Sequence, residues 1–284
     1  MKFFLIALLF IAGCSAAPKS EFETKYKNEL TRARELLQDS RSKNVFDKML
    51  ELLAYERFND QQFVKDLIIQ GQFKPVDIAG FRTYFHPLVP INAGDIVIDA
   101  GIALTAYPLF EFSKLVGPDG KVIAFDPDPE VVSLILKKIE QRQIENVEIH
   151  ELGLFDKEGT MTLYMHYNPI IREHGGNTLF GYEGSHDTLN IEVVRLDYFV
   201  EKHNIPRVDF VKMNIEGSEL PALKGMENVL RKHKPSLAMS IYDKPKYLFE
   251  IILWLNSLGL GYEFWLDSHE STHHGKILYA KAKQ

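Results

Sequence analysis

Hydrophobic residues recur at helical spacing in the segment 19–72, which carries charges of both signs and has no Pro or Gly before Gly71. The apolar positions that follow this spacing are Leu30, Ala33, Leu37, Phe46, Met49, Leu50 and Leu53. They predict two or three amphipathic helices within a helical N-terminal extension over residues 19–93. We interpret the extension as a packing arm. Its charges alternate in sign and do not form the basic face that a membrane-surface or partner helix would need.

From Gly94 onward the pattern changes to short apolar runs that alternate with helical segments. The expected strands are 95–100, 121–126, 147–152, 161–166, 191–196, 210–215, 237–242, 262–266 and 276–280, and the expected helices are 110–116, 131–143, 220–232 and 247–258. This alternation is typical of a doubly wound α/β sheet. The last two strands follow each other without a helix between them, so we expect an antiparallel edge.

Composition and charge exclude several classes of protein. Of the 284 residues, 45% are hydrophobic and 25% are charged, which is ordinary for a globular chain. The net charge is −6 and there is no long basic run, so we expect no nucleic-acid partner. The single cysteine, Cys14, excludes an internal disulfide and a Cys-x-x-Cys redox pair.

Residues 1–18 have the pattern of a signal peptide. One lysine precedes an apolar run from Phe3 to Ala12 that is too short to cross a membrane, and small residues follow it. The run ends in Ile-Ala-Gly-Cys, which resembles the signal of bacterial lipoproteins and predicts lipidation of Cys14. We therefore expect a lipid-anchored protein of the bacterial cell envelope. The alternative is ordinary cleavage near Ala17, which would give a secreted or periplasmic protein.

The turn after the first expected strand, Asp99 to Thr105, suits a nucleotide-type cofactor. Ligands of such sheets bind beyond the carboxyl ends of the strands, and Gly101 permits close approach of the backbone. Asp126 closes the second strand. A carboxylate at that place can accept hydrogen bonds from both hydroxyls of a ribose.

Several further motifs stand in a fixed order along the chain. They are GPDGKVIAFDP at 117–127, LDYF at 196–199, VKMNIEGSE at 211–219, LKG at 223–225, YDKP at 242–245 and ILYA at 277–280. Together they resemble the FkbM family of S-adenosylmethionine-dependent methyltransferases, from about residue 94 to residue 280. The resemblance implies a methyltransferase domain over residues 94–284 with a Rossmann-like, seven-stranded class I sheet. It also implies S-adenosylmethionine as cofactor and methyl transfer, usually to a hydroxyl oxygen.

The same resemblance assigns roles to individual residues. Asp99 and Gly101 match the cofactor loop, Thr105 stands at the position of that loop's second glycine, and Asp126 matches the acid that binds the ribose. Asp99, Gly101, Thr105 and Asp126 are therefore the candidate cofactor-binding residues. The motif of the fourth strand supplies the candidate catalytic residues Lys212, Asn214 and Glu216.

Two of these positions depart from the family pattern. Thr105 stands where a second glycine is usual, and Asn214 where an aspartate is usual, which removes a negative charge near a sulfonium. Glu216 has two interpretations, a functional acid or an N-cap of the following helix.

Other polar clusters have weaker functional interpretations. The segment 167–189 has no apolar period and is either a loop that gates the substrate or a simple exposed loop, with His174 and His186 as minor candidate bases. His269, His273 and His274 are expected to be solvated, so we predict no metal site.

Two functions follow from these observations. The leading hypothesis is an O-methyltransferase that acts on a small or saccharide-like acceptor. The alternative is a non-catalytic envelope lipoprotein that retains the methyltransferase fold as a binding module. The departures at Thr105 and Asn214 and the leader favour the alternative, and Asp126 and Glu216 favour an enzyme.

Overall fold

The computed structural model describes residues 20–53, 69, 83–102, 106–165, 167–168, 173–174, 177–181, 187–269 and 275–283. The expected signal peptide with Cys14, and Thr105 of the cofactor loop, lie outside the described residues. Within the described ranges no helix is both long enough and apolar enough to span a bilayer.

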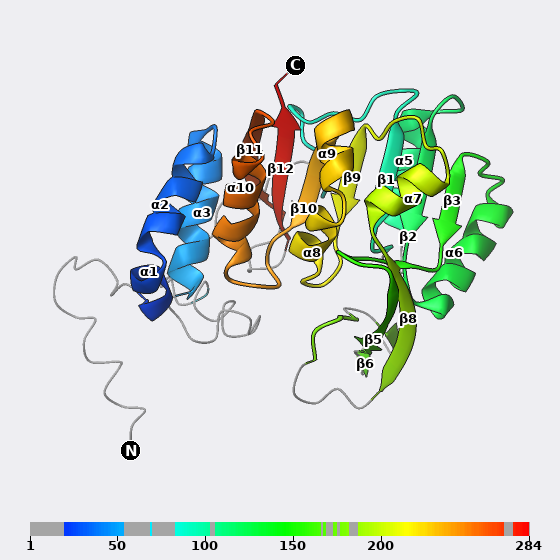
Figure 1. The fold of residues 1–284 in the computed structure, drawn as a ribbon, viewed down its shortest axis with the longest axis horizontal. Helices are drawn as coiled ribbons and strands as arrows, with labels where there is room; N and C mark the ends of the chain where they lie inside the picture. The colour runs from blue at the N-terminus through cyan, green and yellow to red at the C-terminus, as the bar shows by residue number, and fades with distance from the viewer. Residues whose placement is uncertain are drawn as a thin grey trace.

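A seven-stranded sheet forms the centre of the molecule (Figure 1), in the order β11-β12-β10-β9-β1-β2-β3. Its strands are β1 (Ile96–Ala100), β2 (Lys121–Phe125), β3 (Val147–His150), β9 (Phe210–Met213), β10 (Ser236–Ser240), β11 (Tyr262–Ser268) and β12 (Lys276–Ala282). Neighbouring strands from β3 to β10 are parallel, and β12 is antiparallel to β10 and β11. The predicted seven-stranded Rossmann-like α/β fold with an antiparallel edge is confirmed.

Helices cover both faces of this sheet, which explains why the parallel strands β1, β2, β9 and β10 are mostly buried. They are α5 (Tyr107–Val116), α6 (Pro129–Gln141), α7 (Leu196–Lys202), α8 (Glu219–Lys224), α9 (Glu227–His233) and α10 (Tyr247–Ser257). Helices α5 and α6 pack with Val97 of β1 in one apolar cluster. Helices α7 to α10 pack with Ile98, the next residue, in the other.

The helix expected over 220–232 is wrong, because the chain forms two helices there. Helices α8 and α9 are separated at Gly225, where a Cβ atom would lie 2.0 Å from the carbonyl oxygen of Phe155. The Asp197 carboxylate accepts hydrogen bonds from the first amides of α9, at 3.0 Å from Asn228 N and 2.9 Å from Val229 N. The close backbone contact at Gly225 therefore lies where α8 ends, and Asp197 of α7 caps the start of α9.

Two expected strands, 161–166 and 191–196, do not belong to the central sheet. They form a second sheet of β4 (Gly153–Leu154), β5 (Gly159–Tyr164) and β8 (Thr188–Val194), in the order β4-β8-β5. This small sheet lies below the central sheet in Figure 1, beyond the carboxyl ends of β1 and β2. The short runs along the sequence predicted these strands but could not predict the sheet to which they belong.

The N-terminal extension is an integral part of the fold. It forms α1 (Glu21–Lys25), α2 (Lys27–Leu36) and α3 (Ser40–Leu53), which confirms the prediction of two or three helices. Leu37 pairs with Phe264 of edge strand β11, and Gln38 N donates to the Phe264 carbonyl at 3.0 Å. The Arg41 guanidinium contacts the buried Asp267 carboxylate at 2.8 Å. The extension therefore covers an edge that would otherwise be open to pairing with another chain.

The expectation that the helical extension continues to residue 93 is wrong for its described end. Residues 83–93 form turns, with a hydrogen bond of 3.0 Å from Val89 N to the His86 carbonyl. Aromatic packing fixes this segment, because the His86 ring lies 4.8 Å from the Tyr279 ring and the Phe85 ring lies 5.3 Å from the Phe112 ring. The segment thus packs against β12 and α5 immediately before β1.

Removing the Phe46 side chain should destabilise the whole domain. Phe46 is fully buried between the extension and the sheet. We expect Phe46→Ala to lower the free energy of unfolding by about 3–5 kcal/mol in a single urea transition, because it leaves a cavity. Asn44→Ala, at an exposed position of the same helix, is the control. A separate early transition of α1 to α3 would contradict an integral extension.

Candidate active site

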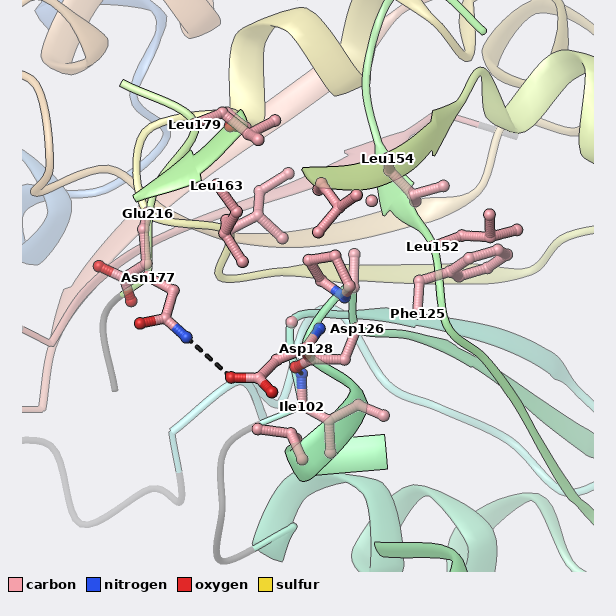
Figure 2. A pocket seen from close by; sticks show the side chains of 18 of the residues that line it. Ile102, Phe125, Asp126, Asp128, Leu152, Leu154, Leu163, Asn177, Leu179 and Glu216 are labelled. Atoms are coloured by element: carbon pink, nitrogen blue, oxygen red, sulfur yellow. Dashed lines mark hydrogen bonds between the residues drawn. The ribbon is translucent and has the colours of Figure 1, made fainter. Parts of the chain in front are cut away.

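A cavity of about 210 Å³ lies where the carboxyl ends of β1, β2 and β9 meet the small sheet (Figure 2). Ala100, Gly101 and Phe125 line it from the central sheet. Leu163 and Ile191 line it from the small sheet. Its polar lining is Asp126, Asp128, Asn177, Asn214, Glu216 and Ser218. The cavity thus has acidic and amide groups along one side and an apolar roof.

Gly101 brings the end of β1 against the end of β9. It has φ +79°, and a Cβ atom there would lie 1.9 Å from the carbonyl oxygen of Asn214. No other residue type fits this close approach and this backbone conformation. The Asn214 amide donates to the Ala100 carbonyl at 3.0 Å, which fixes the same contact. The sequence-based placement of Gly101 in a tight turn is explained by this contact.

Asp126 joins the turn after β1 to the end of β2. Its Oδ2 accepts a hydrogen bond from Ile102 N at 2.9 Å and its Oδ1 accepts one from Asp128 N at 3.0 Å. Burial raises the pKa of Asp126 to about 7, and the two amide donors oppose that rise. The carboxylate lines the cavity and keeps further lone pairs for a ribose hydroxyl. Sequence reasoning missed this bracing role.

Lys212, expected to be catalytic, contacts the turn after β1 and does not line the cavity. Its Nζ lies 2.9 Å from Asp99 Oδ1 and also donates to the carbonyl oxygens of Ala100 and Gly101. These acceptors use all the donors of an ammonium group. Lys212 and Asp99 are almost fully buried, and neither lines the cavity. Both residues therefore support the turn after β1 from the side that faces away from the cavity.

Asn214 and Glu216, the other candidate catalytic residues, both line the cavity. Asn214 Oδ1 accepts a hydrogen bond from the Tyr242 hydroxyl at 3.0 Å. The interpretation of Glu216 as an N-cap is wrong, because Ser218 occupies the cap position of α8 and no side chain caps it. Glu216 has φ +51°, which is unusual for a residue with a side chain. Its carboxylate is thus placed beside the cavity by a constrained turn.

Part of the segment 167–189, expected to be either a gating loop or a simple exposed loop, contributes to the lining of the cavity. Asn177 Nδ2 donates to Asp128 Oδ2 at 2.9 Å, and Thr178 Oγ1 donates to the Glu216 carbonyl at 2.7 Å. Between these contacts and the small sheet, Leu179 lines the cavity (Figure 2). The segment 177–181 therefore bridges the ends of β2 and β9.

The remainder of the loop gives less support to the candidate bases. It contains the short antiparallel strands β6 (Tyr167–Asn168) and β7 (Glu173–His174). His174 lies in β7, and His186 lies outside the described residues.

Tyr84, Glu219 and Asp243 do not line the cavity but lie next to residues of the site, and sequence reasoning gave them no role there. The Tyr84 ring lies 5.1 Å from Lys212 Nζ. Burial of Tyr84 raises the pKa of its hydroxyl well above the usual range, and the charge of Asp99 raises it further. Glu219 is completely buried, and its Oε1 accepts hydrogen bonds from Ile215 N at 2.8 Å and from Ser240 Oγ at 3.2 Å. No sequence pattern distinguishes Tyr84, whereas Glu219 and Asp243 lie within the FkbM-like motifs at 211–219 and 242–245.

The histidines near the C-terminus give no support for a metal site. His269 Nε2 lies 2.9 Å from the Tyr279 hydroxyl, and His273 and His274 lie outside the described residues. In the part of the chain that the structure describes, no group of three or more His, Cys, Asp or Glu side chains is arranged to hold a metal ion.

Comparison with known proteins defines the class. Residues 93–264 match the Methyltransferase FkbM domain. This match covers more than half of the chain, which therefore belongs to the FkbM family of methyltransferases, whose cofactor is S-adenosylmethionine.

Individual relatives are distant. Methyltransferase 1 of Beauveria bassiana is 22% identical over 158 residues, which are 50% of this chain and 63% of the relative. Methyltransferase sdnD of Sordaria araneosa is 22% identical over 203 residues, which are 62% of this chain and 76% of the relative. The hexuronic acid methyltransferase AglP of Haloferax volcanii is 27% identical over 110 residues, or 39% of this chain and 43% of the relative.

The crystal structure of Methyltransferase FkbM from Methylobacillus flagellatus KT has the same fold, with a TM-score of 0.66 and 17% identity. The alignment covers 91% of this chain and 60% of that chain. This chain thus spans less than two thirds of that structure and of the Beauveria protein.

The residues of the cavity fit S-adenosylmethionine. The Asp126 carboxylate suits the ribose hydroxyls, and the apolar side chains of Phe125, Val131 and Leu152 suit an adenine ring. Glu216 supplies negative charge for a sulfonium. The lining therefore combines apolar side chains suited to an adenine ring with carboxylates suited to a ribose and a positively charged sulfur.

Loss of the Lys212 ammonium should destabilise the protein strongly. Lys212→Met leaves the fully buried Asp99 without its partner, so we expect the free energy of unfolding to fall by about 3–5 kcal/mol in urea titrations. Lys224→Met, at an exposed position of α8, should change it little. A loss under about 1 kcal/mol for Lys212→Met would show that the pair does not support the turn.

Glu219 should make stability depend on pH. Burial raises its pKa from 4.5 to about 7, so between these values the folded protein keeps a proton that the unfolded chain releases. The free energy of unfolding should therefore fall as the pH rises through this window. Glu219→Gln should flatten that fall in urea titrations, whereas Glu201→Gln, an exposed control, should not. An equally steep curve in Glu219→Gln would exclude Glu219 as the source.

Proposed function

We propose that this chain is an active S-adenosylmethionine-dependent methyltransferase that methylates a hydroxyl oxygen of a small or saccharide-like acceptor. The observation that carries the proposal is the cavity beyond β1, β2 and β9, which combines Asp126, Asn214 and Glu216 with an apolar roof. The distant similarity to a hexuronic acid methyltransferase supports a sugar acid as acceptor.

The residues of the site divide into those that hold the cofactor and those that face the acceptor. S-adenosylmethionine supplies an electrophilic methyl group on a positively charged sulfur. Asp126 would bind its ribose, and Gly101 lets the backbone of the turn approach it. Glu216 would lie on the acceptor side, because β9 and β10 stand on the opposite side of β1 from β2. Positioning of the two reactants supplies most of the rate enhancement in such a displacement.

Asp126→Ala should weaken binding of S-adenosylhomocysteine measured by calorimetry. Loss of hydrogen bonds to a charged group costs roughly 1.5–3 kcal/mol, which corresponds to about a 10- to 150-fold higher Kd. The exposed Asp119 provides the control Asp119→Ala. A Kd that is the same for the wild type and Asp126→Ala would reject the ribose role.

The alternative function, a binding module without catalysis, is separated by a transfer assay. Incubation with methyl-labelled S-adenosylmethionine and a panel of hexuronic acid glycosides should label an acceptor if the chain is an enzyme. Tight binding of S-adenosylhomocysteine with no labelling of any glycoside would favour the binding module. The lipid anchor at Cys14 and a location in the bacterial cell envelope stay predictions, since they rest on the leader pattern.

A further inference from the structure

Three carboxyl groups gather at the carboxyl ends of β9 and β10. Glu216 follows β9, Glu219 begins α8, and Asp243 follows β10. The carboxyl groups of Asp243 and Glu216 lie within hydrogen-bond reach of each other. Glu219 acts on both through its charge. The cluster reaches the cavity through Glu216, which lines it.

Two oxygens of this cluster are buried without a donor. No N–H or O–H group of the described residues reaches Asp243 Oδ2 or Glu219 Oε2. A buried carboxylate oxygen without a donor is costly. Asp243 and Glu216 are in contact, so a proton shared between them lowers this cost at Asp243, since one carboxyl group then donates and the other accepts.

The surroundings of Asp243 favour this shared proton. Burial is the largest cause that raises the pKa of Asp243, and the charges of Glu219 and Glu216 raise it further. The ionisable groups that face Asp243 are Glu216, Glu219, Tyr242, Lys244 and Tyr247. The Lys244 ammonium lies over the ring of Phe180. Burial lowers the pKa of Lys244. Lys244 is the one basic group among the ionisable groups named here, and it faces three acids.

The turn that carries Glu216 is held in an uncommon conformation. Glu216 has φ +51° and Gly217 has φ +91°. The carbonyl of Glu216 accepts from Thr178 Oγ1, and the carbonyl of Gly217 accepts from the Tyr247 hydroxyl. Backbone held in such a conformation by surrounding contacts is found at sites where a side chain must point in one direction. Here it keeps the Glu216 carboxylate between Asp243 and the cavity.

We propose that Glu216 and Asp243 share one proton and work as a pair, in which Glu216 is the base for the acceptor hydroxyl and Asp243 is its positioning residue. This inference rests on the proposed methyltransferase function. Protonated Asp243 donates to Glu216 and orients its carboxylate. The acceptor oxygen then forms a bond to the methyl carbon while the carbon–sulfur bond breaks. The electron pair of that bond stays on sulfur, and the hydroxyl proton passes to Glu216.

Carbon-13 NMR of protein labelled at the Asp and Glu carboxyl groups tests the pair without an acceptor. In the wild type we expect one carboxyl resonance of the cluster to titrate above neutral pH. Asp243→Asn and Glu216→Gln should each abolish that titration, because either change removes the partner with which the proton is shared. The control is Glu250→Gln on α10, which removes an acid that faces Lys246 outside the cluster. It should leave the titration in place.

The outcomes separate this inference from the proposed function. A high-pH titration that persists in both Asp243→Asn and Glu216→Gln would assign it to Glu219 and overturn the pair. Absence of the titration in the folded wild type would overturn it as well. If the wild type shows the titration and both variants lose it, but calorimetry detects no S-adenosylhomocysteine binding, the pair stands and the methyltransferase function fails. Thermal melting of each variant confirms that it is folded.

Discussion

The buried ion pair between Asp99 and Lys212 is the contact on which the site depends. The two residues are direct partners in the pairing of parallel strands β1 and β9, and both side chains are almost fully buried. A pair in such surroundings is stable only when its remaining donors and acceptors are satisfied. Lys212 meets this condition by donating also to the carbonyls of Ala100 and Gly101. The chain is thereby held where it leaves β1, and the Gly101 turn takes its place against Asn214.

The carboxylates near this pair fall into two groups that the environment treats differently. Asp99 faces a cation and Asp126 accepts two backbone amides, so their negative charge is compensated by fixed groups. Glu216, Glu219 and Asp243 lie on the other side of β1 and act on one another through their charges. Burial raises the pKa in both groups, at Asp99 and Asp126 as well as at Glu219 and Asp243, so the two groups differ in their partners and not in the direction of the pKa shift. Environments that separate the behaviour of like groups distinguish binding acids from proton-transferring ones. Under the proposed function, this difference in partners would assign cofactor binding to the side of β2 and proton transfer to the side of β9 and β10.

The sequence predicts the central sheet well and the details of the site less well. Apolar runs identify most strands of the sheet because β1, β2, β9 and β10 are largely buried, and Gly101 and Asp126 follow from their positions at strand ends. The second sheet is not predictable in this way, since β5 and β8 pair across an intervening loop. Tyr84 reaches Lys212 from a segment that has no pattern of its own, and only tertiary packing reveals it.

Under the proposed function, the roof of the cavity is the part of the site best suited to determine the acceptor. Its floor is fixed by strand ends that must also hold the sheet together, so a change at Gly101 or Lys212 would disturb the fold. Its roof comes from the small sheet and the segment 177–181, which touch the floor through a few side chains such as Asn177. Segments that make few contacts with the core can change in sequence without loss of the fold. A different roof on the same floor would therefore admit a different acceptor while the cofactor site stays unchanged.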